Sequence, residues 1–191
     1  MYLSTDGLEK VVRNGDQVYF EGGVRCMVVD VEESCFTIWA KNDGIIQCRE
    51  SVKLPEKHSR LPIIKAEDVT DLEYLSQMHR IDYISVPFVE NKEDLAEVRK
   101  MIPFLDSAVI ISRIDDKLGL EDFWNIANNS GAIIFNRSGL AISYNADKLF
   151  QLNRFFIEQC NILATPMIIE TEVMESMDDW SFPTRKEVAD L

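Results

Sequence analysis

Four near-continuous apolar runs constrain the fold of this chain more than any other feature. They are rich in β-branched residues, and they read YISVPFV (83–89), SAVIISRI (107–114), GAIIFNR (131–137) and PMIIETEV (166–173). Uninterrupted apolar runs of this length are typical of parallel strands that are covered on both faces. We therefore predict that these runs form strands of a parallel sheet.

The stretches before and between these runs have a helical period. Apolar residues recur every three or four positions in three of them: Val69, Leu72 and Leu75; Leu95, Val98, Ile102 and Leu105; and Leu149, Leu152, Phe155, Phe156 and Cys160. This spacing places the apolar side chains on one face of a helix. Strands and helices in alternation predict an α/β fold, either a parallel sheet or an arc of a (β/α) barrel.

The N-terminal part of the chain has a different pattern. Between residues 10 and 50, short apolar runs such as QVYF, VRCMVVDV, CFTIWA and IIQC are separated by Asn-Gly, Gly-Gly and Asp-Gly turn signals. Runs this close together leave no room for crossover helices, so we predict a small antiparallel β unit. The linker ESVKLPEKHSRLP then marks a boundary, and we expect one domain at residues 1–57 and another at 58–191.

The chain is acidic, with a formal net charge of −13. This charge repels polyanions, so we expect neither nucleic acid nor an anionic membrane as a partner. There is no apolar run long enough to span a membrane and no signal-like N-terminus, which favours a cytoplasmic protein. The four cysteines form no CxxC pair or Cys/His cluster, so we expect reduced thiols rather than a metal site.

Polar and charged residues follow three of the predicted strands. Arg113 and Asp115 end one run, residues 137–139 end the next, and residues 170–172 end the last. The carboxyl ends of parallel strands meet at one rim of such a fold, which is where active sites collect. Strand ends are also polar because the chain must exit into water, so this pattern alone leaves both interpretations open.

Several motifs, taken in order, resemble the pyruvate kinase family. They are LEKVVRNGDQVYFEGGVRCMVVDV, ISRID at 111–115, NRSGLA at 136–141, ADKLF at 146–150, and MESM followed by PTRKEVAD. The resemblance covers essentially the whole chain. It implies a remnant of the small β lid domain, followed by a partial TIM (β/α) barrel of about five βα units. The family transfers phosphate from phosphoenolpyruvate to ADP with Mg²⁺ and K⁺, so the resemblance implies these substrates and ions.

The resemblance also assigns roles to single residues. The family's catalytic lysine falls at Arg113, and arginine binds phosphate but does not release a proton at neutral pH. The first metal carboxylate, a glutamate in the family, falls at Asp115, whose reach is one methylene shorter. The second metal aspartate falls at Gly139, which has no side chain to bind an ion. Ser138 stands where the family has the preceding glycine, and Ser138 and Gly139 line the expected substrate site.

Further positions complete the expected site. The family's threonine is retained as Thr171, between Glu170 and Glu172 where the family has small and amide residues. These acids would either supply a substitute ligand or repel the anionic substrate, and we favour repulsion. Pro87 replaces a family serine near the substrate.

Length adds a separate expectation. An eight-stranded barrel needs about 250 residues, so we expect either that another chain completes the sheet or that this is a truncated product of marginal stability. Two functional hypotheses follow. One is a phosphotransferase with a weakened site. The other, which we favour for the isolated chain, is an inactive pseudoenzyme that binds a metabolite or forms an oligomer with itself or with a complete pyruvate kinase.

Overall fold

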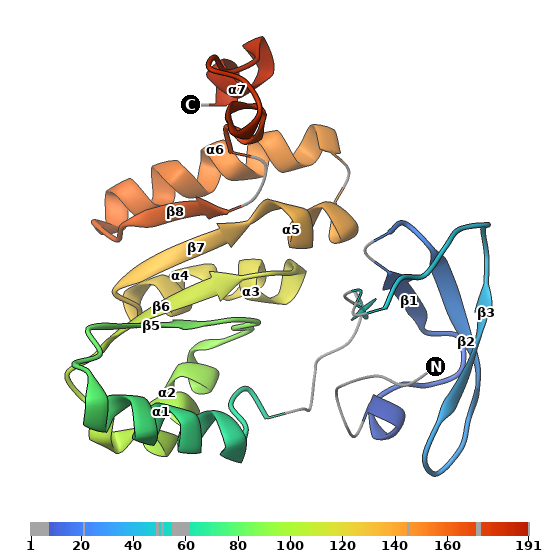
Figure 1. Cartoon of the computed structure of the whole chain (residues 1–191), viewed down its shortest axis with the longest axis horizontal. Helices are drawn as coiled ribbons and strands as arrows, with labels where there is room; N and C mark the ends of the chain where they lie inside the picture. The colour runs from blue at the N-terminus through green and yellow to red at the C-terminus, as the bar shows by residue number, and fades with distance from the viewer. Residues whose placement is uncertain are drawn as a thin grey trace. The chain divides into compact units, whose positions relative to one another are not determined.

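The computed structural model describes residues 8–20, 22–48, 50, 52–54, 62–144, 146–170 and 173–190. The chain divides into two compact units, residues 1–62 and residues 63–191. Figure 1 shows the first unit in blue to cyan and the second in green to red. Each unit is described by itself.

The first unit is a four-stranded antiparallel sheet, as the turn signals predict. Its strands lie in the order β3-β2-β1-β4, after a short 3₁₀ helix η1 at Leu8–Lys10. Their bounds are β1 Gln17–Phe20, β2 Arg25–Val31, β3 Phe36–Ala40 and β4 Val52–Lys53. Alternate residues of β1 and β2 point inward, so that Val18, Phe20, Cys26 and Val28 form the centre of a small core.

One predicted strand is wrong in this unit. The apolar run IIQC at 45–48 is not a strand, and Ile45 is exposed. The fourth strand is instead β4, which lies in the segment assigned to the linker and pairs with β1 through Phe20 and Val52. Whether residues 52–53 form a strand depends on pairing with β1, in which Val52 lies opposite Phe20, 32 residues earlier in the chain. Local hydrophobicity does not reveal such a distant partner.

The second unit is built on a four-stranded parallel sheet in the order β5-β6-β7-β8. The strands are β5 Tyr83–Val86, β6 Val109–Ile114, β7 Ala132–Asn136 and β8 Met167–Glu170. Each coincides with one of the four apolar runs. Neighbouring strands are in parallel register, as in the pairs Ser85 with Ile111 and Phe135 with Ile169. The chain is thus an α/β protein with a barrel-like arc of parallel strands.

Helices precede, separate and follow these strands. Their bounds are α1 Ala66–Met78, α2 Lys92–Met101, η2 Pro103–Leu105, α3 Lys117–Glu121, α4 Phe123–Asn128, α5 Arg137–Ser143, α6 Ala146–Leu163, η3 Glu175–Asp178 and α7 Arg185–Asp190. Asn91 caps α2 by accepting a hydrogen bond from the Asp94 amide, and Asp116 caps α3 in the same way. The three predicted helical stretches correspond to α1, to α2 with η2, and to α6.

The main core lies between the sheet and its helices. Buried residues of α2, α4 and α6, among them Leu95, Phe123 and Phe156, pack against Ile110 and Ile133 of the sheet. Phe123 and Phe156 have ring centroids 4.4 Å apart. Burial of a large apolar side chain contributes about 1.5–3 kcal/mol, so the contacts between the helices and this face of the sheet stabilise the second unit.

The cysteines and the length of the helices bear on two further expectations from the sequence. Cys26 and Cys160 are buried and Cys35 and Cys48 are exposed, and all four thiols are free. Burial raises the pKa of the Cys26 and Cys160 thiols. Among the described helices, none is both long enough and apolar enough to cross a membrane.

Candidate functional site at the carboxyl ends of the parallel strands

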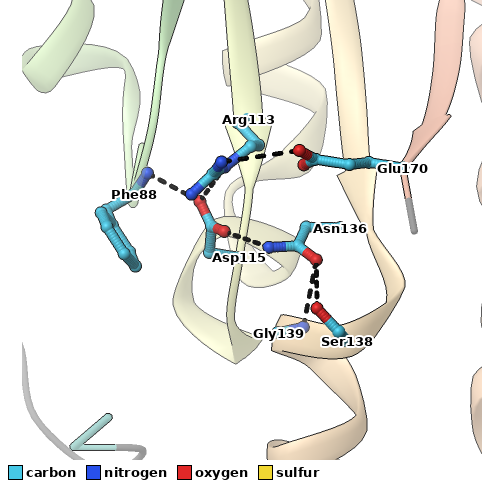
Figure 2. Close-up of polar contacts among 7 residues, drawn as sticks. All are labelled: Phe88, Arg113, Asp115, Asn136, Ser138, Gly139 and Glu170. Carbon is cyan, nitrogen blue, oxygen red and sulfur yellow. Dashed lines mark hydrogen bonds and ion pairs between the residues drawn. The ribbon is translucent and has the colours of Figure 1, made fainter. Parts of the chain in front are cut away.

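The carboxyl ends of β5, β6, β7 and β8 bring seven residues into one polar network. These residues are Phe88, Arg113, Asp115, Asn136, Ser138, Gly139 and Glu170, and Figure 2 shows the contacts among them. They come from four separate stretches of the sequence, and the parallel sheet aligns the points where those stretches leave it. The predicted convergence of polar strand ends is therefore present in the fold.

Asp115 is the centre of this network. Its Oδ2 atom accepts hydrogen bonds from the Phe88 backbone amide at 2.8 Å and from Arg113 Nε at 3.0 Å. Its Oδ1 atom accepts a hydrogen bond from Asn136 Nδ2 at 2.6 Å. The Asp115 side chain is only 2% exposed. A buried carboxylate must be paired and hydrogen-bonded, and here three donors of the chain do this.

Arg113 lies between two carboxylates. Its guanidinium pairs with Asp115, and its second nitrogen lies 3.7 Å from Glu170 Oε1 on β8. The same guanidinium stacks on the Phe88 ring, with its central carbon 5.6 Å from the ring centroid. This stacking adds a cation–π attraction to the ion pairs. The positive charge of Arg113 is thus directed into the protein network, although 26% of its side chain remains exposed.

Asn136 connects β7 to the start of α5. Its side-chain oxygen accepts a hydrogen bond from the Gly139 amide at 3.2 Å and one from the Ser138 hydroxyl at 2.9 Å. The first of these bonds caps α5, because it satisfies an amide that has no partner within the helix. The same side chain donates to Asp115, so helix capping and the charged network share one residue.

Phe88 contributes its backbone as well as its ring. Its φ angle is 56°, in the left-handed region that residues with a side chain rarely adopt. This conformation accompanies a backbone amide directed at Asp115. The preceding residue, Pro87, was singled out as the replacement of a family serine, and it lies exposed at the end of β5.

The network leaves few side-chain oxygen atoms free to bind a magnesium ion. Mg²⁺ requires near-octahedral oxygen ligands at about 2.1 Å. Both oxygens of Asp115 already accept hydrogen bonds from the chain, and Gly139 has no side chain that could bind an ion. Glu170 Oε2 is a buried oxygen of the network without a hydrogen-bond partner in the described part of the chain. Across the described part of the chain, no group of three or more His, Cys, Asp or Glu residues is arranged to hold a metal.

The structure brings most of the residues expected at the site together. Arg113, Asp115, Ser138, Gly139 and Glu170 belong to one network. Thr171 and Glu172 lie outside the described residues.

Sequence reasoning missed two members of the network, Asn136 and Phe88. Asn136 carried a usable signal, since asparagine is among the residues favoured at the N-cap of a helix. Phe88 carried none, because its contribution to Asp115 is a backbone amide.

Comparison with known proteins decides the family. The family model described as the barrel domain of pyruvate kinase matches residues 1–191, the whole of the chain. The chain belongs to the pyruvate kinase family. The parallel sheet and its helices correspond to part of the family's barrel, and the antiparallel unit corresponds to a lid-like portion.

Individual pyruvate kinases agree with this assignment. The pyruvate kinase of Leishmania mexicana is 30% identical over 193 residues, which cover all of this chain and 38% of that protein. The pyruvate kinase of Hypocrea jecorina is 28% identical over 196 residues, which cover all of this chain and 36% of that protein. A crystal structure of a pyruvate kinase from Cryptosporidium parvum superposes with a TM-score of 0.82 at 27% identity, covering 96% of this chain and 39% of that one. The chain therefore spans well under half the length of these pyruvate kinases.

Proposed function

We propose that this chain is a pseudoenzyme of the pyruvate kinase family, without the phosphoryl transfer from phosphoenolpyruvate to ADP. The observation that carries the proposal is the hydrogen bonding of Asp115. Its two oxygens accept three hydrogen bonds from Phe88, Arg113 and Asn136. Three of its roughly four acceptor positions are therefore occupied, so an ion that binds to Asp115 would compete with these donors.

The charge balance of the rim supports the same proposal. Phosphoryl transfer depends on cations that neutralise the transferring group. At this rim the Arg113 guanidinium is paired with Asp115 and lies close to Glu170. Within this ion-pair network, two carboxylates against one guanidinium leave a net negative charge, which disfavours an anionic substrate. We therefore expect weak binding of phosphoenolpyruvate and ADP, and no rim site for Mg²⁺ or K⁺.

The resemblance at Arg113 and Gly139 points in the same direction. An arginine in place of the family's lysine keeps a positive charge, but it does not exchange a proton at neutral pH. A glycine in place of the second metal aspartate removes a ligand outright. The two substitutions support the proposal through side-chain chemistry. The hydrogen bonds of Asp115 support it separately, through geometry.

The role that we assign instead is assembly with another protein chain, in the cytoplasm. The sheet of the second unit carries exposed apolar residues on the face opposite its helices, including Tyr83 and Ile168. An apolar sheet face is more suited to a protein partner than to a charged metabolite.

The test of lost catalysis combines turnover with ion binding. A coupled assay for pyruvate with phosphoenolpyruvate, ADP, Mg²⁺ and K⁺ should give a rate equal to that of a heat-inactivated sample. Calorimetric titration with Mg²⁺ should give no heat of binding at the rim. A rate clearly above the inactivated sample would refute the proposal.

A double variant, Arg113→Lys with Gly139→Asp, probes the cause of the loss. It frees Asp115 from the guanidinium and adds a second carboxylate, so Mg²⁺ binding should appear in the titration. The control is Arg154→Lys with Asn129→Asp, which likewise replaces one arginine by lysine and adds one carboxylate, at exposed positions away from the rim. Circular dichroism of each variant establishes that it is folded before titration. Equal Mg²⁺ binding by both double variants would show that the rim is not responsible.

A further inference from the structure

Glu170 contributes a weakly held carboxylate to the rim network. Its Oε1 atom lies 3.7 Å from Arg113 Nη1, which is too far for a hydrogen bond. Its Oε2 atom is buried and has no hydrogen-bond partner among the described residues. A buried carboxylate oxygen without a donor costs free energy, so the Glu170 side chain gains little from the place that it occupies.

The contact between Glu170 and Arg113 crosses a whole strand. β7 lies between β6, which carries Arg113, and β8, which ends at Glu170. Arg113 lies opposite Ile134, and Ile134 lies opposite Ile168. Glu170 comes two residues after Ile168, so it is on the same face of the sheet as Arg113. Neighbouring strands are about 4.8 Å apart, so the two side chains meet only because both are long and extend toward each other, as Figure 2 shows.

Other groups than Glu170 hold Arg113 in position. Arg113 Nε donates a hydrogen bond to Asp115 at 3.0 Å, and the guanidinium stacks on the Phe88 ring. Asp115 is itself fixed by hydrogen bonds from the Phe88 amide and from Asn136. These contacts come from β5, β6 and β7 and do not involve β8. We therefore expect the guanidinium to keep its place when the Glu170 carboxylate is removed.

A guanidinium held in this way is suited to an anionic group. Its N–H groups form a planar fork that matches the oxygens of a phosphate. The Glu170 carboxylate lies in front of Nη1, and its charge repels an anion that approaches the same nitrogen. We propose that Glu170 is the residue that excludes anions from Arg113, because its carboxylate occupies the place that a phosphate group would take.

This inference rests on the proposed function and deepens it. The proposed function expects the rim to disfavour anionic substrates, and the inference assigns that effect to one side chain. The changes at Arg113 and Gly139 concern proton exchange and metal binding instead. Removal of the Glu170 charge should therefore allow phosphate to bind without giving turnover, so that binding and turnover are tested separately.

The experiment compares phosphate binding by two variants that each lose one carboxylate. Glu170→Gln removes the charge that faces Arg113 and keeps the size of the side chain. Glu158→Gln is the matched control, because Glu158 lies 3.6 Å from Arg154 on α6. Both changes alter the net charge equally. Inorganic phosphate is added without Mg²⁺ or ADP, at an ionic strength held constant with chloride, and phosphorus-31 NMR measures its affinity.

The two variants should behave differently. Glu170→Gln should bind phosphate at least about tenfold more tightly than the unchanged chain, since a like charge next to the ligand is gone. Glu158→Gln should show no gain, and adding Arg113→Met to Glu170→Gln should abolish the gain. Equal affinities of Glu170→Gln and the unchanged chain would overturn the inference. An equal gain in the control, or a gain that survives Arg113→Met, would overturn it as well.

Folding and turnover are checked independently. Circular dichroism establishes that each variant is folded, and Glu170→Ala replaces Glu170→Gln should the latter not fold. If neither variant folds, Glu170 is needed for the fold and the inference is wrong. A pyruvate-forming rate in the unchanged chain, together with the gain in Glu170→Gln, would refute only the loss of catalysis. No gain in a chain without turnover would refute only this inference.

Discussion

Arg113 Nε lies 3.0 Å from Asp115 Oδ2, at the end of a strand where the two residues are separated by Ile114 alone. The Asp115 side chain is almost fully buried, whereas part of Arg113 reaches solvent. The pair is joined by the Phe88 amide and the Asn136 side chain, so one carboxylate holds together segments from β5, β6 and β7. This arrangement stabilises the rim from within, and its energetic contribution can be measured.

Replacement of Asp115 by alanine should destabilise the second unit by at least about 2 kcal/mol. The reason is that the Phe88 amide and the Asn136 side chain lose their acceptor, and each unsatisfied buried donor costs about 1–3 kcal/mol. Urea unfolding monitored by circular dichroism measures the free energy of unfolding. The control is Asp82→Ala, whose carboxylate forms an exposed ion pair with Arg80. It should change stability by less than about 0.5 kcal/mol.

Replacement of Arg113 by methionine should cost about 1–3 kcal/mol, since it removes a charged hydrogen bond to a buried carboxylate. Methionine retains much of the apolar length of the side chain, so lost packing contributes little. The matched control is Arg154→Met, which breaks an exposed pair with Glu158 on α6. Thermal or urea unfolding should show almost no change for that variant. Similar losses in both variants would show that the rim pair is no stronger than a surface pair.

Replacement of Gly119 by alanine should destabilise the chain, against the usual helical trend. Alanine stabilises a helix relative to glycine by about 0.8–1 kcal/mol. A methyl group at Gly119 would, however, lie 2.6 Å from the Val89 carbonyl oxygen and 3.2 Å from the Ile114 side chain. Backbone does not yield easily, so we expect a net loss of about 1–3 kcal/mol. The sign of the change in unfolding free energy is the test, and a gain would contradict the expected clash.

Glu187 should give the chain a specific sensitivity to acid. It accepts hydrogen bonds from the Ser176 amide and hydroxyl and from the Thr184 amide and hydroxyl, which joins η3 to the start of α7. The hydrogen bonds from Ser176, followed by those from Thr184, lower the pKa of Glu187 from 4.5 to about 2. A lowered pKa in the folded state means that the stabilisation is present above about pH 4.5 and is lost as the pH falls toward 2.

The variant Glu187→Gln tests this assignment. It should show a shallower fall in the urea midpoint between pH 4.5 and pH 2 than the unchanged chain. Glu158→Gln, on the exposed face of α6, serves as the control and should keep the full pH dependence. An unchanged profile for Glu187→Gln would assign the acid sensitivity to other carboxyl groups.

Much of the fold follows from local sequence. The four apolar runs became β5 to β8, because uninterrupted β-branched segments are stable only inside a sheet. Periodic apolar residues predicted α1, α2 and α6, since a helix must bury one face. The convergence of Arg113, Asp115 and Glu170 was also predictable, because parallel strands all end at one rim.

Other features depended on contacts between distant parts of the chain. β4 became a strand only because β1 lies beside it, whereas the more hydrophobic run at 45–48 found no sheet partner among the described residues. The network around Asp115 depended on the left-handed backbone of Phe88 and on the amide of Asn136.

Residue types and spacing thus determined the family, the elements and the rim on which the polar residues gather. Only the tertiary structure decided which groups donate hydrogen bonds to Asp115. One of them is the backbone amide of Phe88, and its direction depends on backbone dihedral angles that the sequence motif does not specify. Strand pairing brings Phe88 and Asp115 together although 26 residues separate them in the sequence, and hydrogen bonds of this length form only after that pairing.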